Sequence, residues 1–260
     1  NANGSFSYNP PRGFEGTDTY IYTVNDGNGV GGGVPATNTA TVTFTVSGMI
    51  WFINNNAGAC ASSCDGRMSN PYTTLAAFNT ANGLSGGLDP ADNDNIFIYE
   101  SATAYTSGIV LRNGQKLFGQ DATVTLNVAT GLSQPNFGNV LPVTNSGNST
   151  AATITNSGGN GVTLASGNTI RGLTIDNVSG AKISGTNFGT LTTSNLIMTG
   201  PGAALNLDNG NLDATVTSLA STSSVTAIKM NNVTGNLNAL GSGSPGISGA
   251  TGPAIEIIGG

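Results

Sequence analysis

Apolar and polar residues alternate in the C-terminal part of the chain, and the alternation recurs at a nearly constant interval. One apolar column recurs after 21, 22, 23 and 27 residues and consists of Val162, Ile183, Leu205, Ile228 and Ile255. The residue after each of these is polar: Thr163, Ser184, Asn206, Lys229 and Glu256. A period of two is typical of a β-strand with one buried face. We therefore predict one short strand per repeat, with the apolar column as a core ladder.

Two further columns indicate how the repeats are arranged. A second apolar column recurs at steps of 23, 23 and 21 residues and predicts a second strand in each repeat: Leu173, Leu196, Leu219 and Leu240. Short strands of this kind bury their apolar faces only when successive repeats stack into a solenoid. A polar column follows the core ladder by four positions: Ser166, Asn187, Asn209 and Asn232. Because Asn tolerates a left-handed backbone, we expect these residues at one corner, with amides bonded between coils.

The coils of about 22 residues, the stacked aliphatic residues and the Asn corner resemble the right-handed parallel β-helix of the pectin-lyase-like fold. The resemblance covers the chain from Met49 to Gly260. It implies an all-β protein in which residues 95–260 form the coils and residues 48–94 form an N-terminal cap. It does not select a function, because this fold carries lyases, hydrolases, adhesins and inert stalks.

The expected cap contains an apolar strand, Met49 to Ile53, and a short helix within residues 69–78. Asn70 is the expected N-cap of that helix and Pro71 lies in its first turn, while Tyr72, Leu75 and Phe78 share one face. The resemblance implies that this helix plugs the end of the core. Residues 129–150 are rich in Asn, Gly and Pro, and we expect a protruding loop there.

Residues 1–47 differ in character from the coils. Three pieces stand out: a Gly-Ser-Phe-x-Tyr-x-Pro stretch at 4–10, a Gly-Phe-x-Gly-Thr-Asp corner at 13–18, and a Thr-rich strand at 39–46. Together they resemble the last strands of a bacterial immunoglobulin-like or cadherin-like tandem domain. Because the early strands of such a domain are missing, we expect a partial β-sandwich. Either a longer chain or a neighbouring copy would complete it, and we expect neither end of this chain to be an end of the working molecule.

Composition narrows the chemistry. Only 8% of the 260 residues are charged, the net charge is −6, and the seven basic residues are scattered, so no nucleic-acid footprint is present. The absence of His excludes Ser-His-Asp and Cys-His catalysis. No apolar run is long enough for a membrane helix. We predict a small disulfide loop between Cys60 and Cys64, with free thiols as the alternative, and a disulfide favours an extracellular setting.

Acidic residues are the remaining candidates for a site. Asp89, Asp92 and Asp94 lie close together before a strand and could supply oxygens to Ca²⁺, and a solvated turn is the alternative. On the coils, Asp176, Asp208 and Asp213 do not share a column, as stacked metal ligands would. We therefore expect no catalytic residues and no cofactor, with Ca²⁺ kept as the one candidate.

These patterns favour a fragment of a large bacterial cell-surface or secreted structural protein: a stalk, an adhesin or a fibre component. The alternative is a polysaccharide-active enzyme, either a lyase or a glycoside hydrolase. Expected partners are neighbouring domains of the same chain or copies in a fibre, with surface glycans as a further candidate. An ice-binding solenoid would need a flat threonine column, and the outward column contains Asn206 and Lys229 instead.

Overall fold

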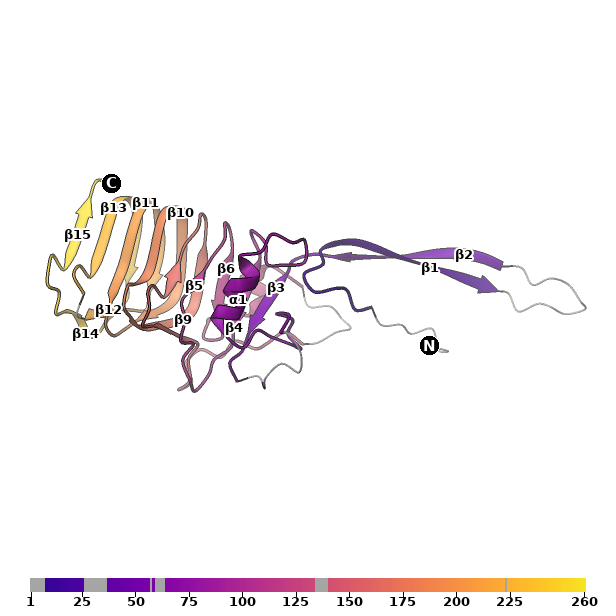
Figure 1. The fold of residues 1–260 in the computed structure, drawn as a ribbon, viewed down its shortest axis with the longest axis horizontal. Helices are drawn as coiled ribbons and strands as arrows, with labels where there is room; N and C mark the ends of the chain where they lie inside the picture. Colours follow the sequence, from indigo (N-terminus) through magenta and orange to yellow (C-terminus); the bar gives the residue numbers. More distant parts are fainter. Residues whose placement is uncertain (1–7, 26–36, 57, 59–63, 134–139, 223) are drawn as a thin grey trace, which may run out of the picture.

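A long hairpin projects from one end of a parallel β-solenoid of about seven turns (Figure 1). This computed structural model describes residues 8–25, 37–56, 58, 64–133, 140–222 and 224–260. Half of the chain is strand and 6% is helix, which confirms the predicted all-β class with a solenoid and an Ig-like N-terminus. In the described part of the chain, no helix has the length and apolar character needed to span a membrane.

The hairpin is formed by β1 (Gly16–Asn25) and β2 (Thr37–Val46), and the two helices are α1 (Leu75–Asn82) and α2 (Leu126–Thr130). The solenoid strands are β3 (Ile50–Ile53), β4 (Asn95–Ile98), β5 (Ile109–Val110), β6 (Lys116–Gly119), β7 (Thr153–Asn156), β8 (Val162–Thr163), β9 (Thr169–Val178), β10 (Ala181–Met198), β11 (Ala203–Val216), β12 (Ser218–Thr222), β13 (Ile228–Ala239), β14 (Ser242–Ser248) and β15 (Ile255–Ile258). All pairings within the solenoid ladders are parallel, and β1 and β2 pair antiparallel.

The core ladder has the predicted register. Val162 pairs with Ile183, Ile183 with Leu205, and the ladder continues through Ile228 to Ile255. The first four residues are at most 5% exposed, whereas Ile255 is 55% exposed. Among the strands of the described residues, β15 pairs with β13 alone, and the apolar side chains of β15 are largely exposed.

The second ladder is predicted correctly for one step only. Leu173 pairs with Leu196, but Leu219 pairs with Met198 and lies two positions away from the expected column. Leu240 is 67% exposed and does not belong to the core. A slip of two residues preserves the inward and outward alternation, so the hydrophobic pattern could not reveal it.

The left-handed backbone expected at the corner is present at all three Asn residues, and the expected bond between coils is seen for one pair. Asn187, Asn209 and Asn232 have φ of +53°, +57° and +49°, and the amide of Asn209 donates a hydrogen bond to the side-chain oxygen of Asn187. Ser166 is a correction, because the left-handed residue of its coil is the neighbouring Gly167, with φ +74°. Gly has no Cβ and takes this conformation without strain.

The capping helix begins later than predicted. Its N-cap is Thr74, whose hydroxyl accepts a hydrogen bond from the backbone N–H of Ala77, so the assignment of Asn70 as N-cap is wrong. The reason is Tyr72, whose backbone exchanges hydrogen bonds with Phe52 and Asn54 and is therefore held extended beside β3. Tyr72 therefore does not share a helix face with Leu75 and Phe78, contrary to the prediction, although all three are buried in the core.

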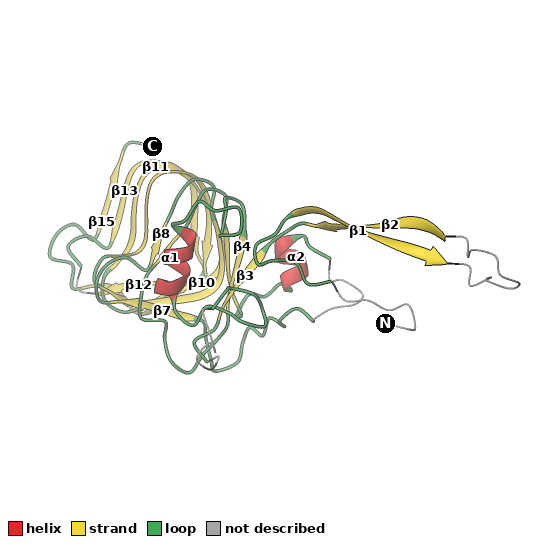
Figure 2. Ribbon diagram, turned by 45° about the vertical axis from the view of Figure 1, so that its right-hand side comes forward, coloured by secondary structure: helices red, strands yellow, loops and turns green. Residues whose placement is uncertain are grey.

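Helix α1, drawn in red in Figure 2, covers the free edge of β5. The side chain of Asn79 accepts a hydrogen bond from the N–H of Val110 at 3.1 Å and donates to the carbonyl of Gly108 at 2.9 Å. Asn82 donates to the carbonyl of Val110 at 2.8 Å. These amides replace a neighbouring strand, because they satisfy backbone groups that would otherwise be left unpaired at a sheet edge.

A second, smaller core lies outside the solenoid and was not predicted. Phe52, Phe97 and Phe118 stack in register on β3, β4 and β6, and Leu126 of α2 packs with them. Strand β4 is thus buried on both faces, which explains the apolar run from Ile96 to Ile98. Part of the predicted loop at 129–150 is therefore the end of a helix.

Candidate functional site

The three Asp residues considered for Ca²⁺ have separate partners. Asp89 forms an ion pair with Arg12 at 2.8 Å, and Asp92 forms one with Arg112 at 3.0 Å. Asp94 accepts hydrogen bonds from the indole of Trp51 and the N–H of Ala91, both at 2.7 Å, while burial raises its pKa. Across the described residues, no group of three or more His, Cys, Asp or Glu is placed to hold a metal ion. The three carboxylates therefore do not form one ligand set.

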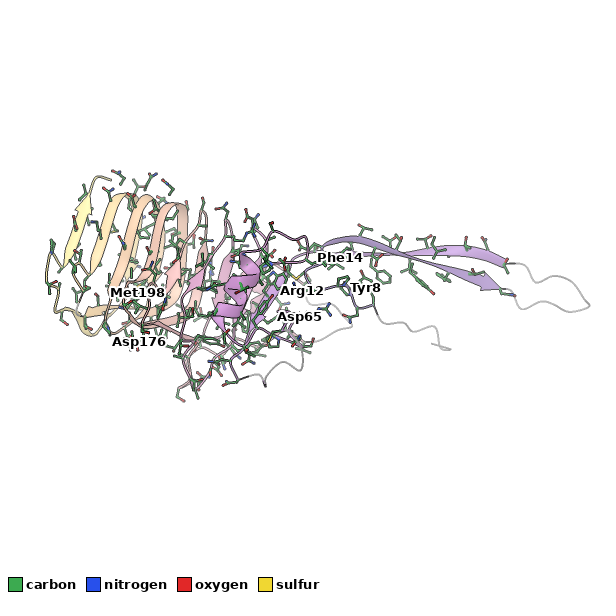
Figure 3. The ribbon with its side chains drawn as sticks, in the orientation of Figure 1. Tyr8, Arg12, Phe14, Asp65, Asp176 and Met198 are labelled. Carbon is green, nitrogen blue, oxygen red and sulfur yellow. The ribbon has the colours of Figure 1, made fainter. Side chains whose placement is uncertain are left out.

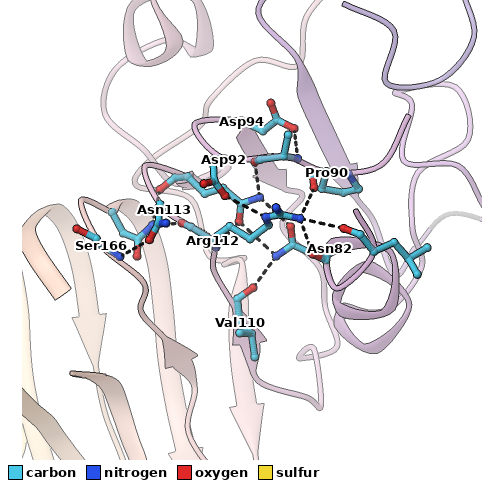
Figure 4. Close-up of polar contacts among 12 residues, drawn as sticks. Asn82, Pro90, Asp92, Asp94, Val110, Arg112, Asn113 and Ser166 are labelled. Carbon is cyan, nitrogen blue, oxygen red and sulfur yellow. Dashed lines mark hydrogen bonds and ion pairs between the residues drawn. The ribbon is translucent and has the colours of Figure 1, made fainter. Parts of the chain in front are cut away.

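Asp92 and Asp94 instead border a buried polar network that joins the cap to the coils (Figure 4). Gln115, which is fully buried, donates to the side-chain oxygen of Asn82 at 2.8 Å and accepts from the N–H of Arg112 at 2.9 Å. Asn168, one coil further, donates to the backbone carbonyls of Arg112 and Gln115. Sequence reasoning missed this network, because single amide residues in an Asn-rich chain carry no recognisable pattern.

Only one of the two cysteines of the predicted disulfide lies within the described residues. Cys64 is disulfide-bonded, and its sulfur lies 4.0 Å from the hydroxyl of Thr73. Cys60 lies outside the described residues. Cys64 belongs to the cap.

The acids on the coils do not form a cluster. Asp208 accepts a hydrogen bond from the amide of Asn231, one coil further, at 2.7 Å, and Asp213 lies beside Thr192 and Asn236 in the strand register. Lys229 forms an ion pair with Glu256 at 3.7 Å, as their shared column predicts. This part of the surface carries isolated polar pairs.

A buried lysine was not anticipated. The side chain of Lys182 is inaccessible to solvent, and its ammonium donates to the backbone carbonyls of Gly200, Pro201 and Gly202 at 3.0–3.1 Å. Burial lowers the pKa of Lys182 to about 8, and the charge of Asp176 opposes that shift. Lys182 thus fixes a turn of the next coil by satisfying three carbonyls.

One concave feature beside the solenoid is a groove of about 450 Å³. It is lined by Asp121, Thr123, Ser146, Gly147, Asn148, Ser149, Thr150, Ala151, Leu173, Thr174, Asn195, Ile197 and Thr217. Eight of these residues carry a hydroxyl or an amide, one carries a carboxylate and none is basic, although most of the accessible lining is apolar. Such a surface suits a neutral ligand with many hydroxyl groups better than an anion.

Two carboxylates hold the loop that forms one wall of the groove. Glu100 accepts hydrogen bonds from the amides of Asn145 and Asn148 at 2.7 and 2.8 Å. Asp121 accepts from the N–H of Ala152 at 2.8 Å. Burial raises the pKa of Asp121, and the nearby charge of Glu100 raises it further. These contacts fix the groove in place, and no sequence pattern connected the residues that make them.

The hairpin has two different faces. Cross-strand partners point to the same side of a ladder. One side therefore carries the pairs Tyr20 with Val42 and Tyr22 with Ala40, while the other carries mostly threonines. The exposed fractions of the Tyr20 and Tyr22 side chains are 63% and 41%. An apolar sheet face is thus left open to solvent.

Residues 9–15 attach the hairpin to the cap (Figure 3). Besides the ion pair between Arg12 and Asp89, Arg67 donates to the side chain of Asn9 at 3.2 Å and to the carbonyl of Pro10 at 2.9 Å. Gly13 has φ +65°, and a Cβ there would lie 2.5 Å from the carbonyl oxygen of Leu88. The segment therefore lies directly against the cap.

Comparison with known proteins identifies the N-terminal module. A family model described as bacterial Ig domain matches residues 1–45, which end within β2. Neither the curated proteins nor the solved structures contain a match to the chain. Bacterial Ig domains often occur in surface or extracellular proteins, and a parallel solenoid is compatible with that setting. The chain is thus a β-solenoid protein whose first 45 residues are similar to a bacterial Ig domain.

Proposed function

We propose that this chain is part of a large bacterial cell-surface or secreted protein in which the solenoid is a structural or adhesive stalk. The observation that carries the proposal is the attachment of an Ig-like hairpin to the cap of the solenoid through residues 9–15. Modules joined by close contacts rather than a free linker suit a long extended structure. The coil architecture and Asn corner support a relationship to pectin-lyase-like β-helices.

Protease treatment of intact producing cells tests this location. Antibodies against the chain should detect its loss from intact cells, while a cytoplasmic marker stays intact. Lysed cells provide the control for protease activity. A chain that is protected in intact cells, absent from the medium and cleaved only after lysis would contradict the proposal.

The groove of about 450 Å³ beside the solenoid supports an adhesive role toward neutral saccharides. Its hydroxyl and amide lining offers both donors and acceptors, and Thr123 already donates to Asn195 at 2.8 Å, which orients that amide. Binding to an array of neutral and acidic glycans should favour neutral ones. Asn195→Ala should weaken that binding about tenfold through loss of polar contacts. Asn177→Ala, at an exposed position outside the groove with the same left-handed backbone as Asn195, is the matched control, and equal loss in both variants would argue against the groove.

The polysaccharide-active alternative is tested on the same glycans. The two carboxylates nearest the groove, Glu100 and Asp121, are already bonded to the loop, which favours binding without turnover. Product release measured by chromatography distinguishes the two functions. Cleavage that is lost in both Glu100→Gln and Asp121→Asn, with folding retained, would establish an enzyme.

A further inference from the structure

Two of the seven basic side chains, those of Lys116 and Arg171, have no bonding partner. Within the part of the chain that the structure describes, neither forms an ion pair or a side-chain hydrogen bond. The other five basic side chains form ion pairs or donate to carbonyls: Arg12, Arg67, Arg112, Lys182 and Lys229. The chain has 13 acidic residues, so a shortage of carboxylates does not explain the two unpaired cations.

The strand register places Lys116 and Arg171 on the same face of the sheet. Arg171 in β9 pairs with Phe118 in β6, and Lys116 precedes Phe118 by two residues. Residues two apart on a strand, and cross-strand partners, point to the same side of a sheet. That side is the outer one, because Phe118 belongs to the small core outside the solenoid. With strands ~4.8 Å apart and a rise of ~3.3 Å per residue, the two Cα atoms are ~8 Å apart. Two long side chains at this distance can contact one small ligand.

Unsatisfied polar atoms flank this pair of cations. The Nε of Arg171 is buried without a hydrogen-bond partner, and so is the Oδ1 of Asn95, the cross-strand partner of Lys116 in β4. The Asn95 side chain is fixed, because its amide nitrogen donates to the carbonyl of Met49 at 3.0 Å. Native structures rarely keep buried polar atoms without a partner unless the site has a further role. This part of the sheet therefore has unused donors and one unused acceptor.

The charges at this position favour an anion as the missing partner. Two cations held near each other repel, and an anion between them converts that repulsion into attraction. The planar guanidinium of Arg171 matches the oxygens of a carboxylate or a sulfate, while the ammonium of Lys116 adds a point charge. Both side chains are partly exposed, so a ligand from solution can reach them.

We infer that Lys116 and Arg171 form a binding site for the carboxylate or sulfate group of an acidic ligand. Neither residue lines the groove of about 450 Å³ beside the solenoid, for which we propose neutral saccharides. The anion site therefore goes beyond the proposed function, and it holds whether or not the groove binds glycans.

Titration of the 260-residue chain with sodium acetate and with sodium sulfate tests this inference. Sodium chloride at equal ionic strength is the reference, and backbone amide signals of β6 and β9 in NMR spectra are the readout. Both probes should give saturable shifts at these strands beyond those with chloride, and the tighter probe identifies the preferred group. Lys116→Gln and Arg171→Gln should each weaken binding at least tenfold, through loss of a charge-assisted contact. Lys116→Glu, which gives Arg171 an internal carboxylate, should abolish it.

Lys229→Gln is the matched control, because Lys229 already pairs with Glu256, and it should bind the probes as tightly as the native chain. Three results would overturn the inference. The first is a set of shifts at β6 and β9 no larger with acetate and sulfate than with chloride. The second is native affinity in both Lys116→Gln and Arg171→Gln. The third is a loss of affinity in Lys229→Gln as large as in those two variants, which would indicate a general charge effect.

Discussion

Individual polar residues stabilise this solenoid at positions where its coils change direction. The left-handed Asn residues turn the chain and bond between coils, and Lys182 fixes a turn from inside. Phe188 is an extra residue in β10 at the corner, and its ring occupies space that a Cβ at Gly210 would need. The Asn corner recurs in three coils, whereas Lys182 and Phe188 each act in one coil, so a consensus repeat would contain the corner but neither of these two side chains.

Asn209→Leu should lower the free energy of unfolding by ~1–3 kcal/mol, measured by urea denaturation. The variant loses the hydrogen bond to Asn187 and places a bulky side chain in a left-handed conformation. Asn236→Leu is the control, because Asn236 is exposed in β13 with an ordinary strand backbone. Equal stability of the two variants would rule out a role of the corner.

Lys182 should give the protein a characteristic pH dependence. Because burial lowers its folded-state pKa to about 8, the unfolded chain binds more protons between pH 8 and the ordinary lysine pKa near 10.5. The free energy of unfolding of the native protein, relative to Lys182→Met, should therefore rise with pH across that window. Lys229→Met, at an exposed ion pair, serves as the control. A difference that is flat with pH would mean that Lys182 titrates normally.

At the scale of elements, helix α1 acts as a cap because its side-chain amides bond to a strand edge. Asn79→Leu retains helix-forming character but leaves the N–H of Val110 and the carbonyl of Gly108 without this partner. We expect a loss of ~1–3 kcal/mol in the free energy of unfolding. Thr80→Leu, on the exposed side of the same helix, should cost less. A thermal unfolding series provides the comparison, and similar losses would show that the helix caps through packing alone.

The accuracy of sequence prediction also varies by element. The core ladder was predictable because five strands repeat the same alternation of apolar and polar residues. The interval between repeats is nearly constant, so equivalent residues pair on successive coils. The N-cap of α1 was misplaced because pairing of Tyr72 with β3 overrides local helix signals. The groove and the Gln115 network depend on contacts between residues far apart in sequence, such as Glu100 with Asn148. Without register information, these contacts leave no trace in a single sequence.

At the scale of the whole molecule, two units of different architecture meet at a compact joint. The solenoid gains order by stacking, whereas the hairpin is held at its base by residues 9–15 and by the bond from the N–H of Met49 to Glu15 at 3.0 Å. The joint contains few residues, yet it determines how the Ig-like module is oriented on the solenoid. Its contacts are partly exposed, so each stabilises the fold little.

Arg12→Ala should therefore loosen the joint with little effect on global stability, within about 1 kcal/mol. Spin labels on the hairpin and the solenoid should show a broader distance distribution when measured by double electron–electron resonance. Lys229→Ala, which removes an ion pair at the opposite end, should leave the distribution unchanged. A narrow distribution in Arg12→Ala would mean that the ion pair with Asp89 does not hold the module.

The docking of residues 9–15 has a mechanical consequence. Gly16 and Val46 are paired at the base of the hairpin, so the chain enters and leaves that module at nearly the same place. Tension applied to the chain ahead of Tyr8 would first load the contacts of Tyr8 with Asp18 and Phe44, and would then reach the cap through Arg12 and Arg67 before it reaches Gly16. While the contacts with the cap hold, the paired base of the hairpin bears little of the load. When the contacts of Arg12 and Arg67 break, the two strands would separate from their paired base. The extra chain length released would reduce the tension on the solenoid.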